Sequence, residues 1–106
     1  MHEVTVIARA KAKAGCEAAL ERELRKVVAP THADPGCLRY TLHRSIEDTA
    51  AFVTVERWTS KDAHDRHLGT PHVRSLFKKL PELLASSPEI SLFELLPEGF
   101  PEKGVI

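Results

Sequence analysis

The chain has 106 residues, and its 15 lysines and arginines are balanced by 15 aspartates and glutamates, so the formal net charge at pH 7 is zero. This length corresponds to one domain, residues 1–106, that can bury a core without disulfide or metal cross-links. A neutral chain lacks the basic excess that nucleic-acid and membrane-surface binding usually need. No apolar run reaches the roughly 20 residues of a membrane-spanning helix. Composition therefore favours a small globular domain with no nucleic-acid and no membrane partner.

The N-terminus and the two cysteines favour a cytoplasmic protein. The first residues lack the basic start of a signal peptide and alternate like a strand instead. Cys16 and Cys37 are isolated, without a CxxC pair and without the spacing to histidine that is typical of zinc sites. We therefore expect two reduced thiols.

The first half of the chain predicts a strand, a helix and a second strand. Residues 2–10 alternate and are rich in β-branched side chains, which is typical of a strand. From Cys16 the apolar residues fall on one stripe of a helix, which Pro30 is expected to end or kink. A turn at 34–36 then leads into a second strand at 37–44.

The second half predicts a third strand, two helical segments and a last strand. Residues 50–58 return as the second arm of an antiparallel hairpin. A Thr-Ser cap starts a helix at 60–68, and a threonine followed by proline starts another at 71–84, with a break expected at Pro81. Residues 89–96 alternate as the last strand.

The order β-α-β-β-α-β predicts an α+β, ferredoxin-like fold, in which a four-stranded antiparallel sheet carries its helices on one face. The core covers about residues 3–96, and residues 97–106 form a turn-rich C-terminal tail. The first and last strands are apolar on both faces, as Val6 and Ile7 illustrate. An uncovered apolar sheet face usually marks an interface. We therefore expect a homodimer joined through this face by two-fold symmetry.

The stretch 52–73 concentrates the residue types that could carry chemistry. It contains the single tryptophan, Trp58, and three of the six histidines. Strand alternation places Phe52 and Glu56 on the same face as Trp58. An inward glutamate must be paired or hydrogen-bonded, and an arginine or a histidine could serve. A structural ion pair is the plainer interpretation of Glu56, and core packing is the plainer interpretation of Trp58.

The histidines of this stretch suggest acid–base chemistry more than metal binding. Pro71 places His72 in the first turn of a helix, where the positive helix end disfavours a charged imidazolium. His64 and His67 share one helical turn, but two histidines give too few ligands and no third ligand has a fixed spacing from them. We therefore expect no metal site and a surface position for His64. Solvated or capping histidines are the plainer alternative for His67 and His72.

Three segments resemble the antibiotic biosynthesis monooxygenase family, small dimeric α+β barrel proteins that include quinol monooxygenases. These segments are the opening strand and loop at 4–15, the turn and strand at 33–42, and the stretch 52–73. The resemblance runs from residue 4 to about residue 94. The family's E-x-W and H-x-x-x-P-H patterns are matched by Glu56, Trp58, His67, Pro71 and His72.

The resemblance implies a cofactor-independent monooxygenase that oxidises a quinol or a similar hydroxyaromatic with dioxygen, using no flavin, heme or metal. The site would deprotonate the substrate, whose carbanion-like anion passes an electron directly to dioxygen. The implied pocket lies between helices and sheet. The residues implied in catalysis are His67, His72 and Trp58, and those implied in substrate binding are Phe52, Tyr40, Phe77 and Glu56.

Three alternatives remain open from the sequence. Some relatives isomerise a small carbonyl compound, and the chain could also be a non-catalytic dimeric ligand-binding domain. Heme-degrading relatives place an asparagine in the first strand, whereas this chain contains no asparagine or glutamine at all, which makes a heme-binding role a minor alternative. Tyr40 could be a core residue with a satisfied hydroxyl instead of a substrate contact.

Overall fold

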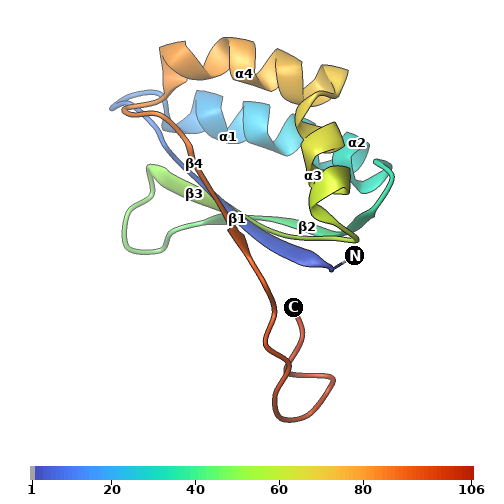
Figure 1. Ribbon diagram of the computed structural model, residues 1–106. Coiled ribbons are helices and arrows are strands. Elements are labelled where there is room, and N and C mark those ends of the chain that lie inside the picture. The colour runs from blue at the N-terminus through green and yellow to red at the C-terminus, as the bar shows by residue number, and fades with distance from the viewer. Residues whose placement is uncertain (1) are drawn as a thin grey trace.

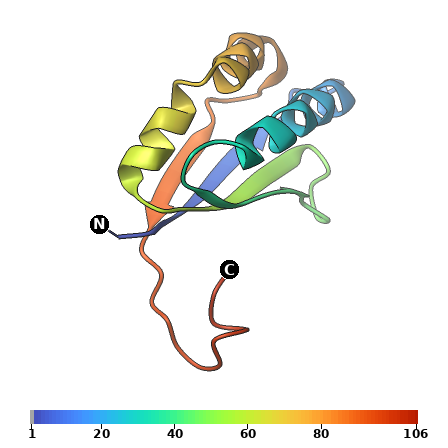
Figure 2. The ribbon, with the colours of Figure 1, turned by 90° about the vertical axis from the view of Figure 1, so that its right-hand side faces the viewer.

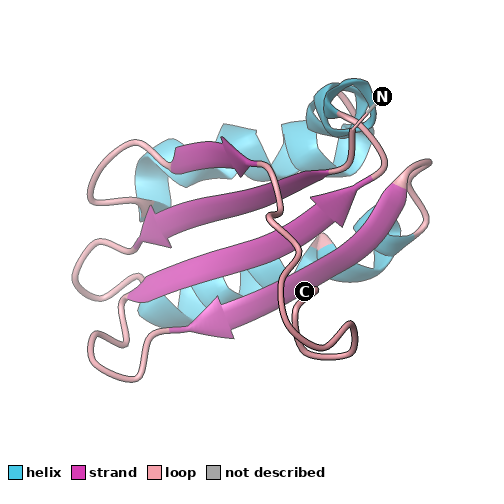
Figure 3. Ribbon diagram, turned by 60° about the horizontal axis from the view of Figure 1, so that its bottom comes forward, coloured by secondary structure: helices cyan, strands magenta, loops and turns pink. Residues whose placement is uncertain are grey.

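In the computed structural model, which describes residues 2–106, four antiparallel strands form one sheet in the order β2-β3-β1-β4 (Figure 3). The strands are β1 (Val4–Lys11), β2 (Cys37–Arg44), β3 (Ala51–Trp58) and β4 (Glu89–Phe93). Their antiparallel pairing and the positions of the helices between them confirm the expected α+β, ferredoxin-like fold.

All the helices lie on one face of the sheet, so the fold has two layers (Figures 1 and 2). They are α1 (Glu17–Lys26), α2 (Val28–His32), α3 (Lys61–Leu68) and α4 (Pro71–Leu83). α1 and α4 pack side by side above the sheet, and α3 lies toward the end where β3 finishes (Figure 1). No helix among residues 2–106 is long and apolar enough to cross a membrane.

Pro30 interrupts the helix as the sequence predicts, whereas Pro81 does not. The first helix already ends at Lys26, and α2 begins at Val28 with Pro30 inside it. A proline ring clashes with the carbonyl four residues earlier, which here belongs to Lys26, so the break precedes the proline. The expected break at Pro81 was wrong, because α4 continues through Pro81 to Leu83.

Packing explains why α4 tolerates its proline. Pro81 lies close to the helix C-terminus, so only a short segment follows the hydrogen bond that its ring removes. The neighbouring Leu80 and Leu84 are both buried in the core, and the Lys13 ammonium donates to the Pro81 carbonyl at 3.2 Å. The last strand is also shorter than predicted and ends at Phe93, which pairs with Thr5 near the start of β1.

Two clusters of buried side chains form the core. One lies under α1 and α4, with Leu20, Leu24, Phe52, Leu76 and Leu80 among its members. The other lies under α3 and contains Val6, Tyr40, Trp58 and Ala63. The alternation predicted for β3 is confirmed: one face of the strand is buried toward the helices and carries Phe52, Thr54, Glu56 and Trp58.

The turn before β2 approaches α3 closely because it contains a glycine. Gly36 has a φ of +85°, and a Cβ at this position would lie 2.5 Å from the Cβ of Ala63. Glycine is the residue that permits both the left-handed backbone and this contact. The turn thus brings residue 34 next to the C-terminal end of α3.

Among residues 2–106, no helix lies on the opposite face of the sheet (Figure 1). The register places Ile7, Val53 and Val55 on this face, and the alternation of β4 adds Phe93, which is 46% exposed. The C-terminal tail leaves β4, passes over this side of the sheet and returns toward it (Figure 3). There the Ile106 carbonyl accepts a hydrogen bond from Arg57.

Trp58 should be one of the residues on which stability depends most. It is fully buried, so Trp58→Ala removes a large apolar side chain from the second cluster. We expect a loss of about 3–5 kcal/mol in the free energy of unfolding, measured by urea denaturation. Trp58→Phe keeps most of the ring and should cost clearly less. A loss below about 1 kcal/mol for the alanine variant would contradict this account of the core.

Candidate functional site

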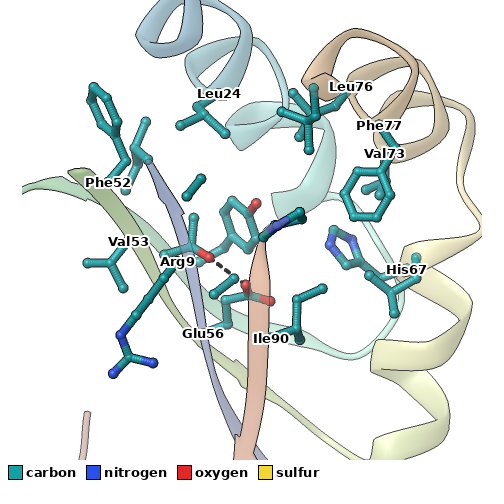
Figure 4. A pocket seen from close by; sticks show the side chains of 18 of the residues that line it. Arg9, Leu24, Phe52, Val53, Glu56, His67, Val73, Leu76, Phe77 and Ile90 are labelled. Atoms are coloured by element: carbon teal, nitrogen blue, oxygen red, sulfur yellow. Dashed lines mark hydrogen bonds between the residues drawn. The ribbon is translucent and has the colours of Figure 1, made fainter. Parts of the chain in front are cut away.

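A pocket lies between the sheet and the helices, with walls from all four strands and from α1, α3 and α4 (Figure 4). Its cavity volume is about 70 Å³. The pocket is therefore a narrow slot. Its apolar walls include Leu24, Phe52, Val73, Leu76, Phe77 and Ile90.

The polar groups of the pocket come from the sheet and from α3. Tyr40, Thr54 and Glu56 project from β2 and β3, and His64 and His67 project from α3. All five side chains are buried. A largely apolar slot with a few convergent polar groups is the usual form of a small-molecule site.

Glu56 accepts two hydrogen bonds from neutral donors. The Thr54 hydroxyl donates to Oε2 at 2.7 Å (Figure 4), and the Trp58 indole N–H donates to Oε1 at 2.8 Å. Neither arginine pairs with Glu56: Arg9 extends away from the pocket (Figure 4), and Arg57 pairs with a different carboxylate. His64 places its Nε2 4.0 Å from Oε1, which is too far for a hydrogen bond. Two neutral donors thus satisfy a carboxyl group that no arginine neutralises.

Burial controls the protonation of Glu56. Loss of solvent raises the pKa of its carboxyl above the usual 4.5, although the hydrogen bonds from Thr54 and Trp58 oppose the shift. Burial also raises the pKa of the Tyr40 phenol well above its usual value, and the nearby Glu56 charge adds to the shift. The pocket therefore favours the neutral form of both groups.

His67 is held by an aspartate from a distant segment. Its Nδ1 lies 2.8 Å from Oδ2 of Asp34, which belongs to the turn before β2. Because a carboxylate can only accept, Nδ1 carries the proton and the lone pair lies on Nε2, at the opposite side of the ring. The ring itself packs against Trp58, with centroids 4.6 Å apart, and against Tyr40 at 5.7 Å. His67 is thereby fixed as a tautomer with a free acceptor.

His72 binds the same carboxylate oxygen. Its Nε2 lies 3.0 Å from Oδ2 of Asp34 and 3.2 Å from the Thr70 hydroxyl. The Thr70 hydroxyl donates its proton to the His67 carbonyl at 2.7 Å. Toward His72 it can therefore act only as an acceptor. The Nε2 proton of His72 is therefore shared between Asp34 and Thr70. One aspartate connects the β2 turn, α3 and the start of α4.

His64 is not the surface residue that the sequence suggested. Only 2% of it is exposed, because the helical face that carries His67 also turns His64 toward Trp58, with ring centroids 5.9 Å apart. Burial lowers the pKa of His64, and the neighbouring His67 lowers it further. Its Nδ1 has no hydrogen-bond partner among the described residues, and its Nε2 lies 4.0 Å from Glu56.

The structure divides the seven residues predicted for the site into two groups. Those that line the pocket are Phe52, Tyr40, Phe77, Glu56 and His67. Trp58 and His72 are not among the lining residues and contact the pocket's polar groups from behind, Trp58 through Glu56 and His72 through Asp34.

Sequence reasoning missed Asp34 and Thr54. Asp34 was assigned only to a turn, and it lies 33 positions before His67, so no local spacing connects the two. The same aspartate and the two histidines place three possible metal-ligand atoms within 4.8 Å of one another. Strand alternation alone could have identified Thr54, because it shares a face with Glu56.

Comparison with known proteins gives one consistent result. The sequence model of the family described as antibiotic biosynthesis monooxygenase matches residues 3–79. A Mycobacterium tuberculosis protein named "Putative monooxygenase Rv0793" is 34% identical over 96 residues, which cover 91% of this chain and 94% of that protein. The Synechocystis protein sll1783 is 29% identical over 68 residues, and the match spans only 46% of its length.

Solved structures agree with this result. The crystal structure of PA3566 from Pseudomonas aeruginosa has a TM-score of 0.85 and 36% identity, with 91% of this chain and 96% of that chain covered. A structure described as an antibiotic biosynthesis monooxygenase has a TM-score of 0.83 and 26% identity, with 89% and 99% covered. These matches confirm the resemblance inferred from the sequence.

The raised pKa of Glu56 predicts a pH-dependent stability. The folded protein holds this proton more tightly than the unfolded chain, whose carboxyl titrates near 4.5. The stabilisation is therefore complete below that pH and is lost as pH rises through the folded-state pKa. Glu56→Gln removes this titration, so the difference in unfolding free energy between wild type and variant should shift in favour of the variant as pH rises from about 4 to about 8.

Urea denaturation at a series of pH values measures this difference. The exposed tail residue Glu98 provides the matched control, because Glu98→Gln should leave the pH dependence unchanged. A difference between wild type and Glu56→Gln that stays constant with pH would show that Glu56 is ionised at the same pH in both states.

Proposed function

Because the chain belongs to the antibiotic biosynthesis monooxygenase family, we propose that it is a cofactor-independent monooxygenase that oxidises a quinol or a similar hydroxyaromatic with dioxygen. The family and the names of its relatives support a monooxygenase-like function in general. The observation that carries the finer proposal is the Asp34–His67 pair beside a narrow apolar pocket. The pair supplies a positioned proton acceptor where a flat ring could bind.

The pocket suits such a substrate in shape and polarity. A slot walled by Phe52, Phe77 and aliphatic side chains fits a flat ring better than a bulky aliphatic molecule. Phe77 is 42% exposed and can cover a ring that enters the slot. The hydroxyl groups of the substrate would lie near His67 and Tyr40, which are two of the polar groups that line the pocket.

His67 acts as the general base in this proposal. Its Nε2 takes the proton of a ring hydroxyl, and the Nδ1–H bond to Asp34 stabilises the imidazolium that forms. The substrate anion carries negative charge on the ring carbon next to the hydroxyl-bearing carbon. That carbon transfers an electron to dioxygen, and the resulting radical pair combines to form a C–O bond.

The remaining steps balance without an external reductant. The peroxide formed at the ring carbon loses water, which takes the distal oxygen and the hydrogen of that carbon, and leaves a C=O group. For a hydroquinone with one free ring position the sum is hydroquinone plus O2 giving hydroxyquinone plus H2O. The substrate supplies all the electrons, so the protein need only bind, orient and move protons.

An isomerase of a small carbonyl compound is the second candidate, and a specific observation favours it. Glu56 is buried with a raised pKa in the pocket that also holds His67. A buried carboxyl group with a raised pKa beside a positioned base is the kind of pair that proton transfer between neighbouring carbons requires. A ligand-binding domain without turnover is the third outcome of the experiment below.

The base assignment predicts a large loss of turnover. His67→Ala should lower kcat by about 10² to 10⁴ with a reduced naphthoquinol or benzoquinol as substrate, because a general base contributes that much. Oxygen consumption measured with an electrode separates the candidates: oxygenation consumes oxygen, isomerisation does not, and a binding domain shows neither. His2→Ala is the control, because His2 is exposed. His64→Ala is unsuitable as a control, because His64 is buried.

Asp34 is a positioning residue and needs its own readout. Asp34→Asn should lower kcat with little change in KM and should shift the pH profile, because asparagine can donate as well as accept and no longer fixes the His67 tautomer. Retention of full oxygenase activity in both His67→Ala and Asp34→Asn would make this histidine structural. Flavin or heme absorbance in the purified protein, or loss of activity after treatment with a chelator, would overturn the cofactor-independent mechanism.

We also propose that the chain forms a homodimer through the open sheet face. Ile7, Val53, Val55 and Phe93 bring apolar surface to that face, which none of the helices α1 to α4 covers. The tail passes over the same side of the sheet (Figure 3) and contains two strongly exposed apolar residues, Leu96 at 79% and Phe100 at 68%. A contiguous apolar patch of this kind is typical of an interface, and two-fold pairing of sheets is the simplest way to cover it.

A charged residue on the open sheet face tests the dimer. Val6 is buried under the helices, whereas Ile7 lies on the open face, so Ile7→Glu is the informative change. Light scattering at micromolar concentration should give about twice the chain mass of 11.8 kDa for the wild type and a lower mass for the variant. Arg22→Glu, on the exposed side of α1, should leave the mass unchanged. A wild-type mass near 11.8 kDa would exclude the dimer.

The proposed reaction implies the partners of the protein, and its cysteines suggest the compartment. The partners are a small aromatic substrate, dioxygen and a second copy of the chain. Cys16 and Cys37 are both free, which suits a reducing compartment, so we place the protein in the cytoplasm.

A further inference from the structure

Asp34, His67 and His72 form a cluster of possible metal ligands at the edge of the pocket. They come from three segments: the turn before β2, the last turn of α3 and the first turn of α4. Their ligand atoms all lie within 4.8 Å of one another. We propose that these three side chains bind one divalent first-row transition cation of the Zn²⁺ class.

The distances suit a common ion. Two ligand atoms bound about 2.1 Å from one metal lie about 3.0 Å apart at a right angle and about 3.4 Å apart at a tetrahedral angle. Oδ2 of Asp34 lies 2.8 Å from Nδ1 of His67 and 3.0 Å from Nε2 of His72. A tetrahedral ion would lengthen these two separations slightly, and the two histidine nitrogens already lie within 4.8 Å of each other. His72, whose side chain is 20% exposed, has room to move.

The ligand chemistry selects the class of cation. Two imidazole nitrogens and one carboxylate oxygen suit Zn²⁺, Ni²⁺, Co²⁺ and Cu²⁺ better than Mg²⁺ or Ca²⁺, which prefer oxygen ligands only. The cluster offers three protein ligands, so water would complete the coordination sphere. Thr70 lies 3.2 Å from Nε2 of His72 and could accept a hydrogen bond from a bound water.

Proton arrangement does not oppose binding. In the absence of metal, Nδ1 of His67 and Nε2 of His72 carry protons that Asp34 accepts. A metal at the centre of the cluster requires both nitrogens to present lone pairs. Each neutral imidazole meets this need by moving its proton to its other nitrogen, so the metal replaces two hydrogen bonds without creating a buried unpaired charge.

If the proposed function holds, the tautomer change also has a consequence for the pocket. When a metal occupies Nδ1 of His67, the ring proton must sit on Nε2, which the proposed mechanism uses as the base. Nε2 then donates and cannot accept a proton from a substrate. The cation is thus an inhibitor of the oxygenase and not its cofactor.

Isothermal titration of the untagged protein with ZnCl2 tests the site without any activity measurement. We expect one Zn²⁺ per chain. His72→Ala and Asp34→Asn should each weaken binding by more than the roughly 10- to 100-fold that loss of an outer-shell partner costs. Both positions are partly exposed, so both variants should fold, which circular dichroism and thermal unfolding verify. His2→Ala, outside the cluster, should bind as the wild type does.

Zinc binding and inhibition of the oxygenase are tested by separate measurements. No stoichiometric binding by the wild type, or unchanged binding by His72→Ala and Asp34→Asn, overturns the metal site; loss of binding in His2→Ala would assign the ion to the N-terminus instead. Nitrogen-15 NMR of the histidine rings should show the proton of His67 moving from Nδ1 to Nε2 when Zn²⁺ is added. If the site binds Zn²⁺ and oxygen consumption by the wild type is not inhibited, the proposed role of His67 as base fails while the metal site stands.

Discussion

The arrangement of this site depends on one carboxylate that accepts two histidine protons. Oδ2 of Asp34 lies within hydrogen-bonding distance of both His67 and His72, and it fixes three chain segments at one point. Gly36 makes the contact possible, because any larger residue would push the turn away from Ala63. If the turn moved, His67 would lose the partner that determines its tautomer. Backbone packing and acid–base chemistry are thus coupled through a single residue.

The buried polar groups follow a second constraint, which is that each must be satisfied inside the protein. Glu56 meets it with hydrogen bonds from Thr54 and Trp58, and burial still raises the pKa of its carboxyl because these neutral donors offset only part of the lost solvation. His64 meets it only in part, since its Nδ1 has no partner among the described residues. Unsatisfied buried groups are costly, and they concentrate where a protein acts on a ligand.

The structural and the functional interpretations of the aromatic residues turn out to be compatible. Trp58 is a core residue, yet its indole N–H holds Glu56 in the pocket and its ring supports His67. Tyr40 is likewise buried in the second core cluster and lines the pocket. A site built from core side chains is rigid, which favours precise orientation of a substrate, and its substitution affects stability and turnover together.

The sequence by itself determined the order of elements, the buried face of β3 and the cap that starts α3, because these depend on periodicities and caps within a few residues. It identified His67 and Glu56 through a family pattern. Only the tertiary structure brought Asp34 to His67, buried His64 and allowed α4 to continue through Pro81. Those outcomes depend on how segments far apart in the chain pack against one another, and local spacing carries no information about that packing.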